Sequence, residues 1–141
     1  MIRRCALALS VLWCALAGAA GATGANPCSF SPSARVVLYA NVYDPDVLVW
    51  DNRQRLLDYS AGGWDIAQIL LPHALLARAG TRAVVLECDP LAVHPKYRAA
   101  PIDALGVKIT SGPYRGRYGW VAEDDVRPVT TRAAQAPGRS K

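Results

Sequence analysis

Histidine is scarce in this chain of 141 residues, and the patterns that usually carry catalysis or bind metals are missing. The two histidines, His73 and His94, lie outside any known catalytic signature. A catalytic nucleophile needs a neighbouring base that a third group orients. The acidic run 123–125 lacks the glycine and the later glutamate of a calcium loop, so we expect a solvated turn there. The sequence therefore predicts no catalytic residue, no metal site and no cofactor.

Apolar runs long enough to span a membrane are also missing. Residues 5–17 (CALALSVLWCALA) are free of charge, but a membrane-spanning helix needs about twenty apolar residues. This run follows Arg3 and Arg4 and precedes the small residues GAAGATGA, a layout typical of a secretory signal peptide. We expect cleavage of residues 1–25, or three residues earlier, and a periplasmic or secreted protein without stable membrane insertion. An uncleaved N-terminal anchor is the alternative.

The expected folded body carries no excess of positive charge. Two of the 16 Lys and Arg residues lie in the signal segment and four lie in residues 127–141, so residues 26–126 hold ten, against 11 Asp and Glu. Their net charge of −1 argues against a basic surface that binds nucleic acid. Residues 130–141 contain no large apolar side chain, and we expect a disordered basic tail there.

Cysteine is limited to four residues, of which Cys5 and Cys14 would leave with the signal segment. The remaining pair, Cys28 and Cys88, has no histidine or further cysteine at the spacing of a catalytic or metal-binding motif. In an oxidising compartment an even pair predicts a disulfide. A bridge that closes a loop of about sixty residues stabilises a fold by roughly 4 kcal/mol in the chain-entropy model.

Short β-branched runs predict a mainly β protein of one domain. Strands are expected at residues 35–42, 82–88, 107–110 and 118–121. Alternation in the second of these places Val84, Leu86 and Cys88 on the inward face. One short helix is expected over residues 52–61.

The boundaries of that helix come from local signals: a capping box from Asp51 to Gln54 precedes it, and Gly62 with Gly63 ends it. Residues 64–78 are ambiguous, because their apolar run suits a helix up to Leu71, whereas Pro72 breaks it and the remainder can be extended. Residues 89–101 contain three prolines and predict a long loop.

The segments AGTRAVVLEC and LGVKITSGPYRGRYGWVAEDDV resemble a bacterial SH3-like domain. The matching positions are Gly80-Thr81, Val107, Ile109, Gly112, Gly116, Gly119-Trp120-Val121 and Asp124-Asp125-Val126. The resemblance implies a small SH3-like barrel over residues 75–129, with residues 26–74 as an N-terminal extension of one strand and one short helix packed on it. The same residues are similar to the KOW motif of RNA-binding barrels, but the expected export favours the SH3-like family. The mature chain as a whole also resembles small exported proteins of proteobacteria.

Aromatic side chains typically line the ligand groove of SH3-like barrels, so the resemblance implies a binding site at Tyr114, Tyr118 and Trp120. Tyr118 and Trp120 are two residues apart and share one face of a strand, opposite Val121. If Val121 points into the barrel, Trp120 is either an exposed binding platform or a cover for the helix at 52–61. The sequence leaves both interpretations open.

These observations predict an exported, non-catalytic binding module for a cell-envelope ligand, which is a peptide, a protein partner or peptidoglycan. Cell-wall peptidases with SH3-like modules carry a separate Cys-His catalytic domain, for which this chain has no room. The alternative is a disulfide-stabilised inhibitor or immunity protein against a secreted hydrolase, acting through residues 91–100 with His94, Lys96, Tyr97 and Arg98. An enzyme of unrecognised type is the third interpretation.

Overall fold

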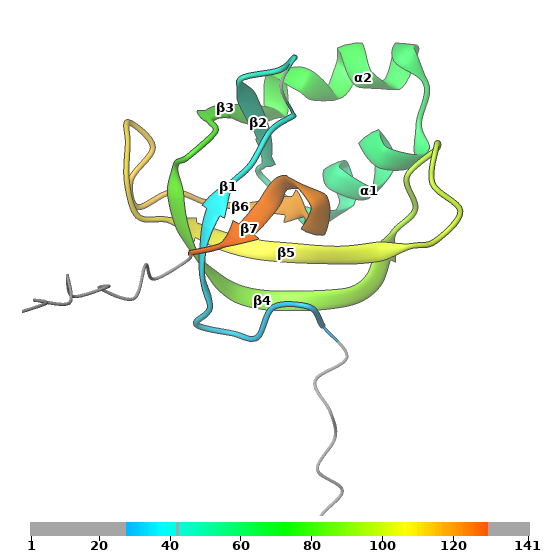
Figure 1. Cartoon of the computed structure of the whole chain (residues 1–141). Coiled ribbons are helices and arrows are strands. Elements are labelled where there is room, and N and C mark those ends of the chain that lie inside the picture. Colours follow the sequence, from blue (N-terminus) through cyan, green and yellow to red (C-terminus); the bar gives the residue numbers. More distant parts are fainter. Residues whose placement is uncertain (1–27, 42, 130–141) are drawn as a thin grey trace, which may run out of the picture.

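The computed structural model describes residues 28–41 and 43–129 (Figure 1). Within them, a single antiparallel sheet of seven strands curls into an open half-barrel, and two α-helices lie beside it. The mainly β fold expected from the sequence is confirmed. The expected signal peptide (1–25) and basic tail (130–141) lie outside the described residues.

The strand order in the sheet is β3-β2-β6-β5-β4-β1-β7, so β3 and β7 form its two edges. The strands are β1 (Arg35–Leu38), β2 (Asp46–Trp50), β3 (Ala74–Arg78), β4 (Arg82–Val93), β5 (Ile102–Ile109), β6 (Tyr118–Ala122) and β7 (Val126–Pro128). The helices are α1 (Arg53–Ala61) and α2 (Trp64–Leu70), with the 3-10 turns η1 (Leu71–His73) and η2 (Glu123–Asp125). None of the helices described here is long and apolar enough to cross a membrane.

Two apolar clusters stabilise the sheet, one on each face. The main core fills the inside of the curl with side chains from all seven strands: Val36, Leu38, Val47, Val49, Ala77, Ala83, Val85, Leu105, Val107, Ile109, Val121 and Val126. The outer core lies beneath α1 and comprises Trp50, Leu56, Val93, Ile102 and Ala104. Each fully buried aliphatic side chain contributes roughly 1.5 to 3 kcal/mol.

A bulge in β4 changes which side chains face the main core. The β4–β5 register shifts between Val85 and Glu87, so that Leu86 is an extra residue in the strand. The prediction that Val84 and Leu86 point inward is wrong: Ala83 and Val85, before the bulge, are the buried residues, and Leu86 is exposed. After the bulge the alternation is reset, and Cys88 packs against the main core as expected.

The loop between β4 and β5 is shorter than the sequence predicts. β4 extends to Val93 and β5 begins at Ile102, so the loop covers residues 94–101 rather than 89–101. Pro90 is tolerated because the pairing of β4 with β5 is interrupted on the N-terminal side of Val93, and no ladder hydrogen bond is lost there.

A disulfide joins Cys28 and Cys88, as the sequence predicts. Beside it, the buried carboxylate of Asp103 accepts hydrogen bonds from the N–H groups of Ser29 (2.8 Å) and Leu91 (2.9 Å). The bridge and this carboxylate together fix the start of the described chain to β4 and β5.

Residues 28–74 contribute more regular structure than the sequence predicts for that segment. It predicts one strand and one short helix, whereas the described part contains β1, β2, α1 and α2. β1 lies between β4 and β7, and β2 lies between β3 and β6, so strands from this segment are hydrogen-bonded into the same sheet as the strands that follow it. The strand β2 is easy to miss because its five residues stand between two turn signals.

The helix expected at residues 52–61 is confirmed as α1, although its N-terminal cap differs from the prediction. The side chain of Asn52, not that of Asp51, accepts a hydrogen bond from the Arg55 N–H at 3.0 Å. Gln54 does not complete a capping box and donates to Asp58 instead. In residues 64–78, which the sequence leaves ambiguous, α2 ends at Leu70, Pro72 lies in η1, and the remainder forms the extended strand β3.

Candidate functional site

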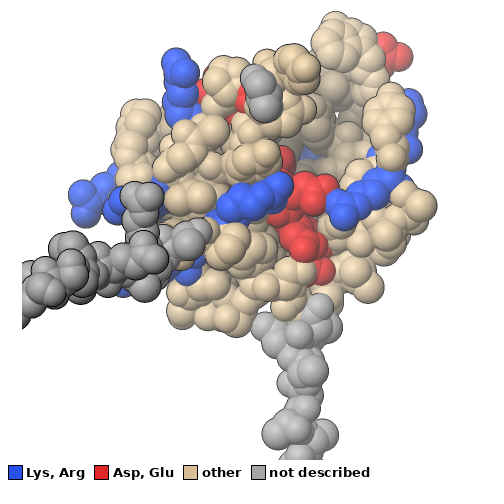
Figure 2. All heavy atoms as spheres, in the orientation of Figure 1, with Lys and Arg blue, Asp and Glu red and all other residues tan. Residues whose placement is uncertain are grey.

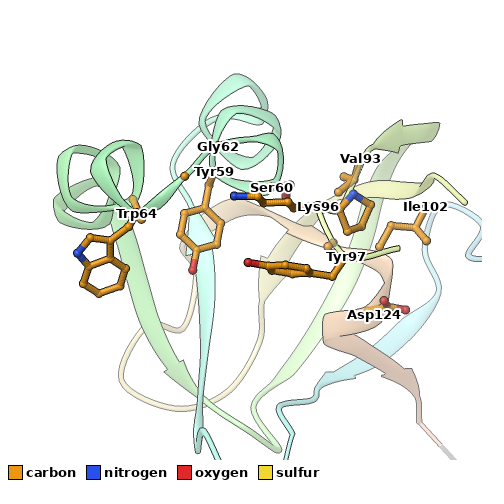
Figure 3. A pocket seen from close by; sticks show the side chains of 13 residues that line it. Tyr59, Ser60, Gly62, Trp64, Val93, Lys96, Tyr97, Ile102 and Asp124 are labelled. Atoms are coloured by element: carbon orange, nitrogen blue, oxygen red, sulfur yellow. The ribbon is translucent and has the colours of Figure 1, made fainter. Parts of the chain in front are cut away.

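A cleft of about 450 Å³ lies between the junction of α1 with α2 and the loop 94–101 (Figure 3). We call it the aromatic cleft, because Tyr59, Trp64 and Tyr97 contribute to its lining. In Figure 3, Tyr97 points across the space toward Tyr59, and Trp64 lies on the far side of Tyr59. The three rings come from α1, α2 and the loop, so the cleft exists only in the folded chain.

Tyr59 is the fixed member of the three. It lies in the last turn of α1, and its ring packs on the ring of Trp50 with centroids 4.7 Å apart and planes tilted by 40°. Trp50 belongs to the outer core and is 1% exposed. This contact orients Tyr59 and anchors one wall of the aromatic cleft to the sheet.

Trp64 owes its position to the glycine pair between the two helices. A Cβ at Gly62 would lie 2.7 Å from the carbonyl oxygen of Asp58, so only glycine allows this close turn. Gly63 is the N-cap of α2, and Trp64 is its first residue, with 72% of its surface exposed. The bend thus places a large apolar ring in solvent beside Tyr59.

Tyr97 is the most exposed ring of the aromatic cleft, at 94%. The ammonium of Lys96 lies 5.9 Å from the centre of this ring. The next residue, Arg98, pairs with Asp124 of η2, which ties the loop to the sheet. That hydrogen bond raises the pKa of Arg98 above its ordinary value, so the guanidinium remains charged.

The acidic turn η2 lies next to the aromatic cleft, and Asp124 contributes to its lining. Acidic side chains gather at the centre of the face shown in Figure 2, with basic side chains on both sides. Within the turn, burial and then the nearby Asp124 carboxylate raise the pKa of Asp125 to about 6. Glu123 accepts a hydrogen bond from the N–H of Asp103 at 3.2 Å, so this side chain also has a structural role.

The aromatic residues proposed from the sequence lie outside this cleft. Tyr114 packs against the main core, whereas Trp120 packs against the outer core and pairs across the sheet with Trp50. Tyr118 is 59% exposed, and the ammonium of Lys108 lies 5.2 Å from its ring centre. The structure therefore does not bring Tyr114 together with the other two.

The sequence predicts only part of the aromatic cleft as a candidate site. Tyr97 belongs to the loop that the inhibitor alternative singles out, whereas no motif in the sequence points to Tyr59 or Trp64. The signal for Trp64 is its place directly after Gly62 and Gly63, where a helix break exposes the residue that follows.

Ionisable groups suited to metal binding are few in the described part of the chain. The sulfur atoms of Cys28 and Cys88 and a carboxylate oxygen of Asp103 lie within 4.8 Å of one another, but the sulfurs are joined in the disulfide. The two histidines are exposed and lie apart, one in η1 and one in the loop 94–101. The aromatic cleft, lined by aromatic rings and by Ser60, Lys96 and Asp124, offers stacking, hydrogen bonding and charge pairing.

Comparisons with family models, with curated proteins and with solved structures find no match to this chain.

Proposed function

We propose that this protein is an exported, non-catalytic binding module of the SH3-like type, and that it binds a cell-envelope ligand in the aromatic cleft. The observation that carries the proposal is the cleft itself, a space of about 450 Å³ with two largely exposed aromatic rings beside a fixed one. Exposed aromatic rings at the edge of an open pocket are typical of partly wet binding surfaces.

Two features support the exported, SH3-like part of the proposal. The curled antiparallel sheet is compatible with a small open barrel, and Gly119, Trp120 and Val121 lie in β6, an interior strand of that sheet. The disulfide between Cys28 and Cys88 is of the kind that persists in oxidising compartments.

Among the cell-envelope ligands, we take peptidoglycan as the first to test. Its sugar rings have apolar faces that can lie on Trp64 and Tyr97, and its hydroxyl, amide and carboxylate groups can pair with polar side chains of the rim such as Lys96. A short peptide or a protein partner is the alternative ligand for the same cleft.

The test is co-sedimentation of the purified protein with insoluble peptidoglycan. We expect the wild-type protein to be retained, and both Trp64→Ala and Tyr97→Ala to weaken retention at least about fivefold, because an aromatic anchor contributes more than about 1 kcal/mol to binding. Tyr43→Ala is the matched control, since Tyr43 is 95% exposed and does not line the cleft. Absence of retention, or equal losses in all three variants, would contradict peptidoglycan binding at this cleft.

The inhibitor alternative is favoured by one observation, the exposure of Tyr97 at the tip region of the loop 94–101. If the loop enters the active site of a secreted hydrolase, the protein should inhibit a cell-wall hydrolase in a turbidity assay, and Tyr97→Ala should remove the inhibition while Trp64→Ala retains it. Loss of inhibition with both variants would instead indicate that the aromatic cleft, and not the loop alone, binds the hydrolase.

A further inference from the structure

The two edges of the sheet differ in how their outward backbone groups are satisfied. β7 pairs with β1 alone, and β3 pairs with β2 alone. The N–H and C=O groups on the outer side of an edge strand can pair with another strand unless the protein blocks them.

The β7 edge is closed. The carbonyl of Asp125 accepts a hydrogen bond from the N–H of Tyr39, the residue that follows β1, at 2.8 Å. Because antiparallel partners alternate, Val126 and Pro128 direct their backbone groups outward. The N–H of Val126 donates to the carbonyl of Glu123, and the carbonyl of Val126 accepts from the guanidinium of Arg127 at 2.7 Å. Pro128 has no N–H. A further strand would find no free donor here.

The β3 edge has the opposite character. Just beyond the two ends of the β2–β3 ladder, the N–H of Asp51 donates to the carbonyl of His73 at 3.2 Å, and the N–H of Ala79 donates to the carbonyl of Pro45 at 2.9 Å. Because antiparallel partners alternate, odd-numbered residues of β3 bond to β2, and Ala74, Leu76 and Arg78 direct their backbone groups outward.

Two of the six outward groups on β3 are used locally. The N–H of Ala74 donates to the carbonyl of Leu71, and the carbonyl of Arg78 accepts from the N–H of Thr81 at 3.1 Å. Four groups have no hydrogen-bond partner within residues 28–41 and 43–129: the N–H and C=O of Leu76, the C=O of Ala74 and the N–H of Arg78.

We propose that β3 is the surface through which two copies of this protein form a dimer, with the two β3 strands antiparallel about a two-fold axis at Leu76. In that register the Leu76 residues of the two copies exchange both backbone hydrogen bonds. Each Arg78 N–H donates to the Ala74 carbonyl of the second copy. All four free groups of each chain are then paired, and the two sheets become one continuous sheet.

The side chains agree with this pairing. Leu76 is 57% exposed and meets Leu76 of the second copy on the outer face, so that both are removed from water. Arg78 lies opposite the small Ala74 rather than opposite another charge, which avoids like-charge repulsion. The free donors and acceptors of β3 match those of a second β3 strand one for one, and a second copy is therefore the occupant to which the proposal commits.

The test is sedimentation velocity on the full disulfide-bonded protein over about a thousandfold range of concentration, because an edge-strand interface is small and its dimer weak. We expect reversible dimer formation. Leu76→Lys places two like charges opposite each other and should weaken dimerisation at least about tenfold. Leu91→Lys is the matched control, since Leu91 is 58% exposed on β4 and does not lie at the β3 edge, and it should dimerise as the wild type does.

Hydrogen exchange of the wild-type protein provides a second measurement that does not depend on a variant folding. The amides of Leu76 and Arg78 should exchange more slowly in concentrated than in dilute samples. A monomer at all concentrations, a Leu76→Lys variant that dimerises like the wild type, or exchange rates of these two amides that do not change with concentration would each overturn the proposal. Protection that requires the addition of a different protein would also overturn it, in favour of a foreign strand at this edge.

Discussion

Trp120 is the residue for which the sequence left two interpretations open, and its surroundings favour the structural one. It packs against the outer core, across the sheet from the buried Trp50, and its side chain is half-buried. Trp120→Ala should lower the free energy of unfolding by about 2 to 4 kcal/mol, somewhat less than for a fully buried tryptophan. Urea denaturation measures this loss.

Tyr118 is the matched control for that experiment, because it lies on the same face of β6 and is 59% exposed. Tyr118→Ala should change stability by no more than about 0.5 kcal/mol, as for most surface substitutions. If Trp120→Ala lowered the free energy of unfolding as little as Tyr118→Ala does, the Trp120 ring would not support the outer core. That result would favour the interpretation of Trp120 as an exposed binding platform.

Asp125 should make stability depend on pH. Burial raises its pKa to about 6 in the folded protein, above the ordinary value of 3.8. A raised pKa means that the folded state holds the proton more tightly than the unfolded state does. The contribution of Asp125 to the free energy of unfolding is therefore most favourable below pH 4 and is lost as the pH rises through 6. Ionised Asp125 should therefore cost about 1 to 3 kcal/mol at pH 7.5.

Asp125→Asn isolates this effect, because the amide is neutral at every pH and its oxygen can still accept a backbone hydrogen bond. The variant should be more stable than the wild type at pH 7.5, and the difference should shrink toward zero near pH 4. Unfolding free energies from urea titrations between pH 4 and 8 give the comparison. A difference that is constant across this range would show that the carboxyl group is not perturbed by burial.

Helix α2 is expected to be the least stable element of the fold. It has no buried residue, and its N-cap, Gly63, provides no side-chain hydrogen bond. Its amides should exchange with solvent faster than those of α1, which buries Leu56 and is capped by Asn52. Hydrogen exchange followed by mass spectrometry compares the two helices, and equal protection of both would contradict this expectation.

Sequence reasoning worked best for elements whose signals are local. The helix α1 has a polar cap before it and glycines after it, and β6 alternates glycine and valine inward with aromatic residues outward. It failed where a distant contact sets the structure. The bulge at Leu86 and the separate interruption that accommodates Pro90 both depend on how β4 pairs with β5, and the sequence of β4 alone does not show that pairing.

The candidate site was the harder part to predict for the same reason. Tyr59, Trp64 and Tyr97 are spread over three segments, and they meet in one cleft through the packing of α1 on the outer core, the bend at Gly62 and the pairing of Arg98 with Asp124. The aromatic residues that the sequence suggests, Tyr114, Tyr118 and Trp120, are close together along the chain, and a sequence shows only this kind of proximity. Tertiary contacts decide which of these rings remain in solvent.

At the scale of the whole molecule, the disulfide should account for a large part of the stability. The bridge spans 60 residues of sequence, from the start of the described chain to β4. Replacing both Cys28 and Cys88 with serine should destabilise the protein by about 4 kcal/mol in the chain-entropy model. In a domain of this size that loss lowers the melting midpoint by more than about 10 °C. A thermal melt checks it, and an unchanged midpoint would show that the bridge contributes nothing to the fold.

We propose that the ligand binds in the aromatic cleft and not on the β5–β6 hairpin. Chemical-shift mapping by NMR, with soluble peptidoglycan fragments added to the isotope-labelled protein, tests it most directly. The claim predicts that the largest shifts occur at Tyr59, Trp64 and Tyr97, with saturation at a common dissociation constant. Shifts centred on Tyr114 and Tyr118, or no shifts at all, would contradict it.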